Sequence, residues 1–104
     1  MDYKVIITED AVADMDGFLH YLLFEKKNEQ AAANLIDDFE VTTATLANAA
    51  ENLKMCENQH LKKFGYRRIN FESHRYFMLY RVEGDKVYVD NIFHELQDYE
   101  NRMI

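Results

Sequence analysis

Apolar and polar positions in the first half of the chain follow two different periods. Residues 3–7 are β-branched in part and alternate weakly, which predicts a short strand. From residue 11 to residue 27, apolar side chains recur at helical spacing and the segment ends in two lysines, where cations suit the helix dipole. Residues 28–53 keep a second apolar stripe over about six turns. The short connection predicts an antiparallel helical hairpin.

Each predicted helix begins with a residue that can cap it. Thr8 precedes the first helix and Asn28 precedes the second, and both side chains can accept a hydrogen bond from a free N–H of the first turn. Glu9 and Asp10 follow Thr8, where acids favour a helix N-terminus. These signals predict where both helices start.

The second half of the chain changes to a strand pattern. Residues 66–71, 76–82 and 86–93 are rich in β-branched and aromatic side chains and predict three strands. Gly84 lies between the last two, where it can supply a positive φ, so these strands are expected to form a hairpin. Residues 96–104 could form one or two helical turns if they dock against the sheet.

The last predicted strand contains a conflict of register. Val87 and Val89 occupy odd positions and Ile92 an even one. Either both faces of this strand are covered, or a bulge near Asp90 and Asn91 shifts the pattern. The element order β-α-α-β-β-β, with a short terminal helix, belongs to the α+β class.

Length and composition add limits to this picture. The 104 residues suit one domain, residues 1–104, with 48% hydrophobic residues and one cysteine, Cys56, so no internal disulfide can form. No metal or organic cofactor is indicated. No apolar run approaches a membrane span and the first residues lack a secretory signal, so we expect a cytoplasmic protein without a membrane partner.

Charge is polarised along the chain. Residues 1–59 hold twelve acids and four bases, residues 60–81 one acid and six bases, and residues 82–104 six acids and two bases. The net charge of −7 argues against nucleic acid as a partner, but the central cationic stretch does not.

Three segments then carry a family resemblance. Phe-Gly-Tyr-Arg-Arg-Ile occupies residues 64–69, His-Arg-Tyr-Phe-Met-Leu-Tyr-Arg-Val residues 74–82, and Ile-Phe-His-Glu-Leu-Gln-Asp-Tyr residues 92–99. In this order, with the acidic Gly84 turn between the last two, they resemble the RelE/ParE toxin superfamily over nearly the whole chain. The resemblance implies a mostly antiparallel twisted sheet with the helical hairpin packed on one face.

The same resemblance implies the toxin of a type II toxin–antitoxin module, as in plasmid stabilisation systems, neutralised by a cognate antitoxin. The superfamily contains inhibitors of DNA gyrase, which are ParE-like, and ribosome-dependent mRNA endoribonucleases, which are RelE-like. Fold alone does not choose between these targets. An inactive member that binds antitoxin or regulates its operon is a third hypothesis, and the oligomeric state, homodimer or toxin–antitoxin hetero-oligomer, stays open.

A nuclease would need a base, a cation for the phosphate and an acid. The candidates for these roles are Lys62, Lys63, Arg67, Arg68, His94 and Tyr99. Strand alternation would put Arg67 and Arg68 on opposite faces. A structural hydrogen bond explains His94 at least as well as catalysis does, and packing of the terminal helix explains Tyr99 better than catalysis does.

The chain also departs from the nuclease pattern. Phe77 stands where RelE-like nucleases tend to have an arginine in the middle strand, and residues 95–98 replace arginines after the last strand. Gln59 stands where another branch has a glutamate base. These departures favour the ParE-like hypothesis, in which the toxin inhibits gyrase, over the nuclease.

Overall fold

The computed structural model describes residues 2–50, 62–72 and 75–96. Along the chain the elements are β1 (Lys4–Ile7), α1 (Glu9–His20), a π-helical turn η1 (Tyr21–Glu25), α2 (Glu29–Ala49), β2 (Arg67–Asn70), β3 (Tyr76–Glu83) and β4 (Lys86–His94). The predicted end of the second helix at residue 53, Cys56, Gln59 and the terminal helix from residue 97 lie outside the described residues.

Both predicted caps are present. The Thr8 side chain accepts a hydrogen bond from the Ala11 N–H at 3.3 Å, and the Asn28 side chain accepts one from the Ala31 N–H at 3.0 Å. Thr8 also donates to the carbonyl oxygen of Val89 at 3.0 Å, so the residue that starts α1 is fastened to β4. The start of the helical hairpin is therefore fixed to the sheet as well as capped.

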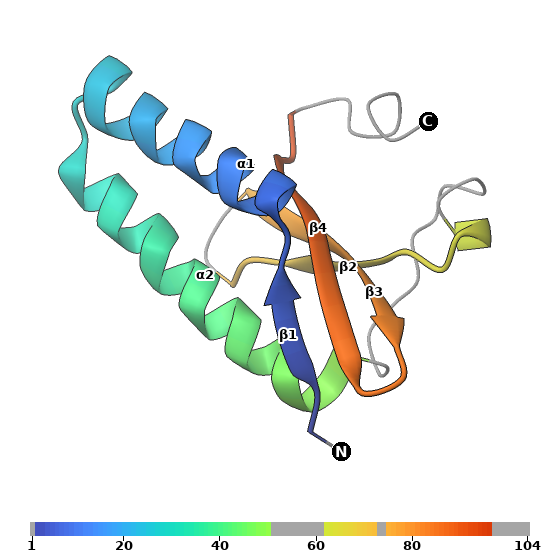
Figure 1. The fold of residues 1–104 in the computed structure, drawn as a ribbon. Helices are drawn as coiled ribbons and strands as arrows, with labels where there is room; N and C mark the ends of the chain where they lie inside the picture. The colour runs from blue at the N-terminus through green and yellow to red at the C-terminus, as the bar shows by residue number, and fades with distance from the viewer. Residues whose placement is uncertain (1, 51–61, 73–74, 97–104) are drawn as a thin grey trace.

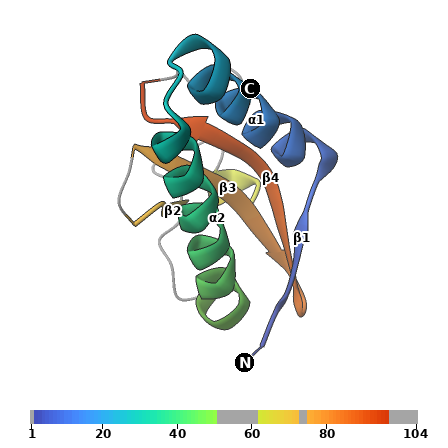
Figure 2. The same cartoon turned by 90° about the vertical axis from the view of Figure 1, so that its left-hand side faces the viewer.

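The four strands form one sheet in the order β1-β4-β3-β2. β1 runs parallel to β4, whereas β4 with β3 and β3 with β2 are antiparallel. The predicted β-hairpin of the last two strands is confirmed, because Glu83 pairs with Lys86 around a turn in which Gly84 has φ 62°. The two helices lie on one face of the sheet (Figures 1 and 2).

The register conflict in the last strand is a β-bulge. Leu79 pairs with Asn91 and Tyr80 with Val89, so Asp90 is an extra residue of β4 opposite one step of β3. The bulge returns Ile92 to the face that holds Val87 and Val89, and all three side chains are buried in the core between sheet and helices. Of the two explanations from the sequence, the bulge is the one found.

A smaller cluster lies on the opposite face of the sheet. Phe77, Leu79 and Phe93 are buried there, with Tyr66 packed beside them. The position that carries an arginine in RelE-like nucleases is thus a buried ring in this protein. Within the described residues, no helix is long and apolar enough to cross a bilayer.

Candidate functional site

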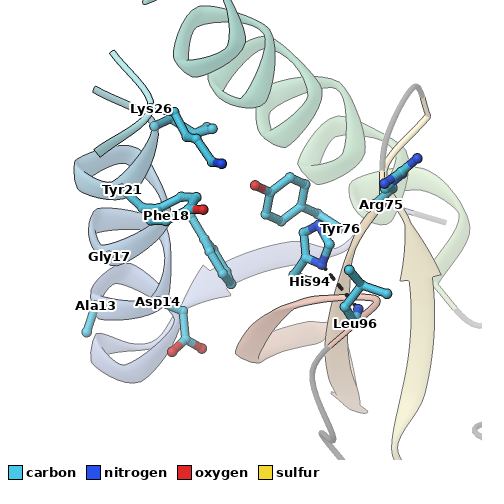
Figure 3. Close-up of a pocket in the computed structure, with 11 residues that line it drawn as sticks. Ala13, Asp14, Gly17, Phe18, Tyr21, Lys26, Arg75, Tyr76, His94 and Leu96 are labelled. Carbon is cyan, nitrogen blue, oxygen red and sulfur yellow. Dashed lines mark hydrogen bonds between the residues drawn. The ribbon is translucent and has the colours of Figure 1, made fainter. Parts of the chain in front are cut away.

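A groove of about 860 Å³ lies between α1, η1 and the adjoining ends of β3 and β4. Phe18 and Lys26 project from the helix side toward Tyr76 and His94 on the strand side (Figure 3). The helix side contributes Ala13, Asp14, Gly17, Phe18, Tyr21, Leu22 and Lys26, and the sheet side Arg75, Tyr76, His94 and Leu96.

Three aromatic rings in edge-to-face contact line this groove. Phe18 and Tyr76 meet edge to face at 5.0 Å, and Tyr76 and His94 do the same at 5.0 Å. Burial, followed by the nearby phenol of Tyr21, raises the pKa of Tyr76 above its usual value. Tyr76 therefore remains protonated at neutral pH, where its hydroxyl can donate a hydrogen bond to a ligand or water.

His94 is the candidate acid or base that the groove contains. Its Nδ1 accepts a hydrogen bond from the backbone N–H of Leu96 at 3.1 Å. In the neutral ring the proton then lies on Nε2, and the lone pair that would remove a proton from a 2′-hydroxyl is already used. The contact favours a structural role, fixing the turn after β4, over general-base catalysis.

Apart from Arg75, the cations of the central stretch that the structure describes lie outside this groove. Lys62 and Lys63 are exposed in the turn that precedes β2. Arg67 pairs with Tyr80, which faces the helices, and Arg68 pairs with Leu79 on the opposite face. The prediction that these two arginines point to opposite faces is confirmed. Arg68 stacks over the Phe77 ring at 3.7 Å and donates to Asn70 Oδ1 at 3.0 Å.

The candidates do not form one constellation. His94 shares the helix-facing side with Arg67, but their partners Tyr76 and Tyr80 are four residues apart on β3, about 13 Å along the strand. Arg68 lies on the other face. Tyr99 and Gln59 lie outside the described residues. The structure thus separates Arg67, Arg68 and His94.

Arg81, another cation of the central stretch, is held by two carboxylates and lies against an aromatic ring. Arg81 donates to Asp90 Oδ2 at 2.9 Å, contacts Glu83 at 2.8 Å and lies over the Tyr88 ring at 4.5 Å. The hydrogen bond to Asp90 raises the pKa of Arg81 further above its usual value. Two carboxylates neutralise this guanidinium, which makes it a poor clamp for phosphate.

The sequence profile of the ParE toxin of type II toxin–antitoxin systems, parDE, matches residues 5–99. The chain belongs to the ParE toxin family. It is therefore a type II toxin of the ParE/RelE superfamily, as the sequence resemblance indicated. The search of curated proteins finds no significant match.

Solved structures agree with the ParE fold. A chain of the chromosomal ParDE toxin–antitoxin system from P. aeruginosa superposes with a TM-score of 0.69 at 20% identity, over 88% of this chain and 95% of that one. A chain of the toxin–antitoxin complex RelBE2 from Mycobacterium tuberculosis gives 0.59 at 18% identity, over 90% of this chain and 99% of that one. At these identities the likeness is one of fold, which the ParE and RelE branches share.

Proposed function

We propose that this ParE-family toxin arrests growth by binding and inhibiting DNA gyrase, without cutting RNA, and that a cognate antitoxin holds it inactive in the cytoplasm. The observation that carries the proposal is the dispersal of the nuclease candidates. Arg67 and Arg68 lie on opposite faces, and the Nδ1 lone pair of His94 is bonded to its own chain. Membership of the ParE family supports the gyrase branch.

Charge on the sheet supports the same proposal. RNA cleavage requires cations that are free to strengthen their contacts as phosphate charge develops. Arg81 is held by Asp90 and Glu83, and Phe77 is a buried ring at the position of a nuclease arginine. Inhibition by binding needs a complementary surface but no such constellation.

An mRNA endoribonuclease is the second candidate, because the exposed Lys62 and Lys63 lie in the turn just before Arg68. The test measures gyrase supercoiling with the purified toxin, and maps transcript ends after induction in a bacterium. Inhibited supercoiling with intact transcripts supports the proposal. New transcript ends with unaffected gyrase would overturn it in favour of the nuclease.

A triple variant separates the two activities further. Lys62→Gln, Lys63→Gln and Arg68→Gln together remove the two exposed lysines before β2 and the half-buried arginine on the face opposite the helices, and a nuclease built on them should lose transcript cleavage. Normal growth on induction of soluble, folded wild-type toxin would refute both toxic activities. It would leave the inactive, antitoxin-binding member as the explanation.

A further inference from the structure

The groove around His94 has the size and the lining of a small-molecule site. Its volume of about 860 Å³ falls within the range of about 300–1,000 Å³ that is usual for ligand pockets. Its walls come from two separate parts of the fold, the helical hairpin and the adjoining ends of β3 and β4 (Figure 3). Most of its lining side chains are apolar or aromatic and a few are polar, which is the usual composition of such pockets.

The two walls of the groove are fixed to each other. Asp14 of α1 accepts hydrogen bonds at Oδ2 from the Ile92 N–H at 2.9 Å and from the Asn91 side chain at 3.2 Å, which ties the helix to β4. The Phe18 ring also meets the Tyr76 ring edge to face at 5.0 Å. A ligand would therefore enter a site that is already formed, which lowers the entropic cost of binding.

Aromatic rings on both walls are available to a planar ligand. Phe18, Tyr76 and His94 contact one another in that order, and Tyr21, which is 47% exposed, lies on the helix side. Tyr21 belongs to the π-helical turn η1, and such turns occur frequently at functional sites. A ring in the ligand could stack on Tyr21 and meet the other rings at their edges. The lining thus favours a ligand that contains a planar ring.

The polar groups of the groove favour an anion. Lys26 lies over the Tyr21 ring at 5.7 Å and projects toward Tyr76 across the opening (Figure 3). Among the described residues, Lys26 forms no ion pair. Arg75 adds a second cation at the edge of the groove, in a weak and exposed pair with Glu95 at 3.6 Å. The lining therefore holds two bases and one acid, although the net charge of the chain is −7.

We propose that this groove binds a small anion that carries an aromatic ring, of the class of the nucleoside monophosphates. The base would lie against Tyr21 and the rings beside it, and the phosphate would accept hydrogen bonds from Lys26 and from the Tyr76 hydroxyl. Because burial raises the pKa of Tyr76, its hydroxyl keeps its proton at neutral pH and can act as this donor.

Other ligands fit the groove less well. Inorganic phosphate would leave the aromatic wall without a partner, and a free aromatic amino acid would bring its ammonium group close to Lys26. A nucleic-acid strand would bring further phosphates against helices whose residues 9–49 contain nine acids and two bases. The assignment of this site is independent of the proposed inhibition of gyrase.

The first test measures the binding of adenosine 5′-monophosphate (AMP) to the purified toxin by calorimetry, beside adenosine and inorganic phosphate. AMP should bind with a dissociation constant below about 1 mM. Adenosine and phosphate should each bind at least about tenfold more weakly, because each makes only part of the contacts. In the amide NMR spectrum, the shifts caused by AMP should centre on the residues that line the groove.

Two pairs of variants in the helical turn locate the site. Lys26→Gln should weaken AMP binding about fivefold or more and leave adenosine binding unchanged. Lys27→Gln, next in the chain but outside the groove lining, should change AMP binding by less than about twofold. Tyr21→Ala should weaken the binding of both AMP and adenosine, whereas Phe24→Ala, 64% exposed and also outside the lining, should affect neither.

Absence of AMP binding to the folded wild-type toxin at about 1 mM would overturn the inference. Equal loss of AMP binding in Lys26→Gln and Lys27→Gln would also overturn it, since the groove would then not be the site. Single-stranded RNA that binds more tightly than AMP and displaces it would make nucleic acid the occupant instead. If AMP binds as expected while gyrase is unaffected by the toxin, the gyrase proposal fails and the groove assignment stands.

Discussion

Asp90 joins three parts of the fold through hydrogen bonds, although it belongs to none of the sequence motifs. Asp90 is the extra residue of the β4 bulge and has no paired residue on β3. Its carboxylate accepts hydrogen bonds from Tyr66 and from Arg81, each at 2.9 Å. Its carbonyl oxygen accepts a third from Thr8 at 3.2 Å. One carboxylate residue thereby fastens the entrance to β2, strand β3 and the start of α1.

Replacing Asp90 by asparagine should therefore lower the stability of the toxin. Asp90→Asn keeps the size of the side chain but removes the negative charge to which Arg81 and Tyr66 donate hydrogen bonds. This change should lower the free energy of unfolding by about 1–3 kcal/mol. Asp85→Asn, in the exposed turn of the β3–β4 hairpin, is the matched control and should change little. Urea unfolding measures both, and equal stability of the two variants would contradict the role assigned to Asp90.

Tyr76 should make stability depend on alkaline pH. Burial raises its pKa in the folded protein, so the folded state holds the phenolic proton at pH values where the unfolded chain has released it. The contribution is fully present below the ordinary tyrosine pKa of about 10 and is lost as the pH rises through the folded pKa.

Tyr76→Phe tests this dependence, because it keeps the ring that contacts Phe18 and His94 but has no proton to lose. The free energy of unfolding, measured by urea titration at several pH values around and above about 10, should fall less steeply in the variant than in the wild type. An identical decline in both proteins would show that Tyr76 does not contribute.

The element with the least regular backbone is the connection between the helices. The Lys26 N–H donates to the Tyr21 carbonyl at 3.0 Å, a spacing of five residues, and the Asn28 N–H donates to the Leu22 carbonyl at 2.8 Å. Between them Lys27 has φ 50°, in the left-handed region. A strained residue, Lys27, thus lies between the π-helical turn and the Asn28 cap of α2.

Lys27→Gly should stabilise the hairpin. The left-handed conformation costs a residue with a Cβ about 1–2 kcal/mol, and the greater freedom of glycine in the unfolded chain offsets about 0.5–1 kcal/mol. A net gain of about 0.5 kcal/mol is expected. Lys26→Gly, at φ −89°, has no strain to relieve and should lower the melting temperature instead. A lower melting temperature for Lys27→Gly would contradict the assignment.

Local signals predicted most elements, and the features that they did not predict are a local π-helical turn and the pairing of distant segments. Thr8, Asn28 and Gly84 act through their nearest neighbours, so their roles were readable from the sequence. The π-helical turn was not, because a five-residue hydrogen bond leaves no mark in hydrophobic spacing. The position of β1 beside β4 depends on contacts between residues more than 80 positions apart, such as Lys4 with Lys86.

The candidate site was predicted only where alternation decides it. The opposite faces of Arg67 and Arg68 follow from strand period, whereas the neutralisation of Arg81 depends on a bulge that turns Asp90 toward it. The register conflict between Val89 and Ile92 pointed to a bulge near Asp90, but it did not reveal the contact of Asp90 with Arg81. The use of His94 Nδ1 by Leu96 has no sequence signal, since it arises from a backbone turn.

At the scale of the whole molecule, the excess negative charge lies in the helical hairpin and not in the sheet. Outside residues 9–49 the chain has ten acids and ten bases, so the net charge of −7 belongs to the helical hairpin and the remainder is balanced. The helical hairpin also carries the exposed Val12 and Ile36, which line an apolar groove of about 310 Å³ between α1, α2 and the end of β1. Its charge therefore opposes self-association through this apolar groove.

This protection should fail when salt screens it. At about 0.15 M salt the Debye length is about 8 Å, and free toxin should sediment as a monomer because the hairpins repel each other. At about 1 M salt the length falls to about 3 Å, and the apolar groove should drive reversible self-association. Ile36→Arg should stay monomeric at both concentrations, whereas Val41→Arg should behave as wild type. Sedimentation velocity distinguishes these cases, and association that weakens as salt rises would show that the hairpin charge attracts a second copy rather than repelling it.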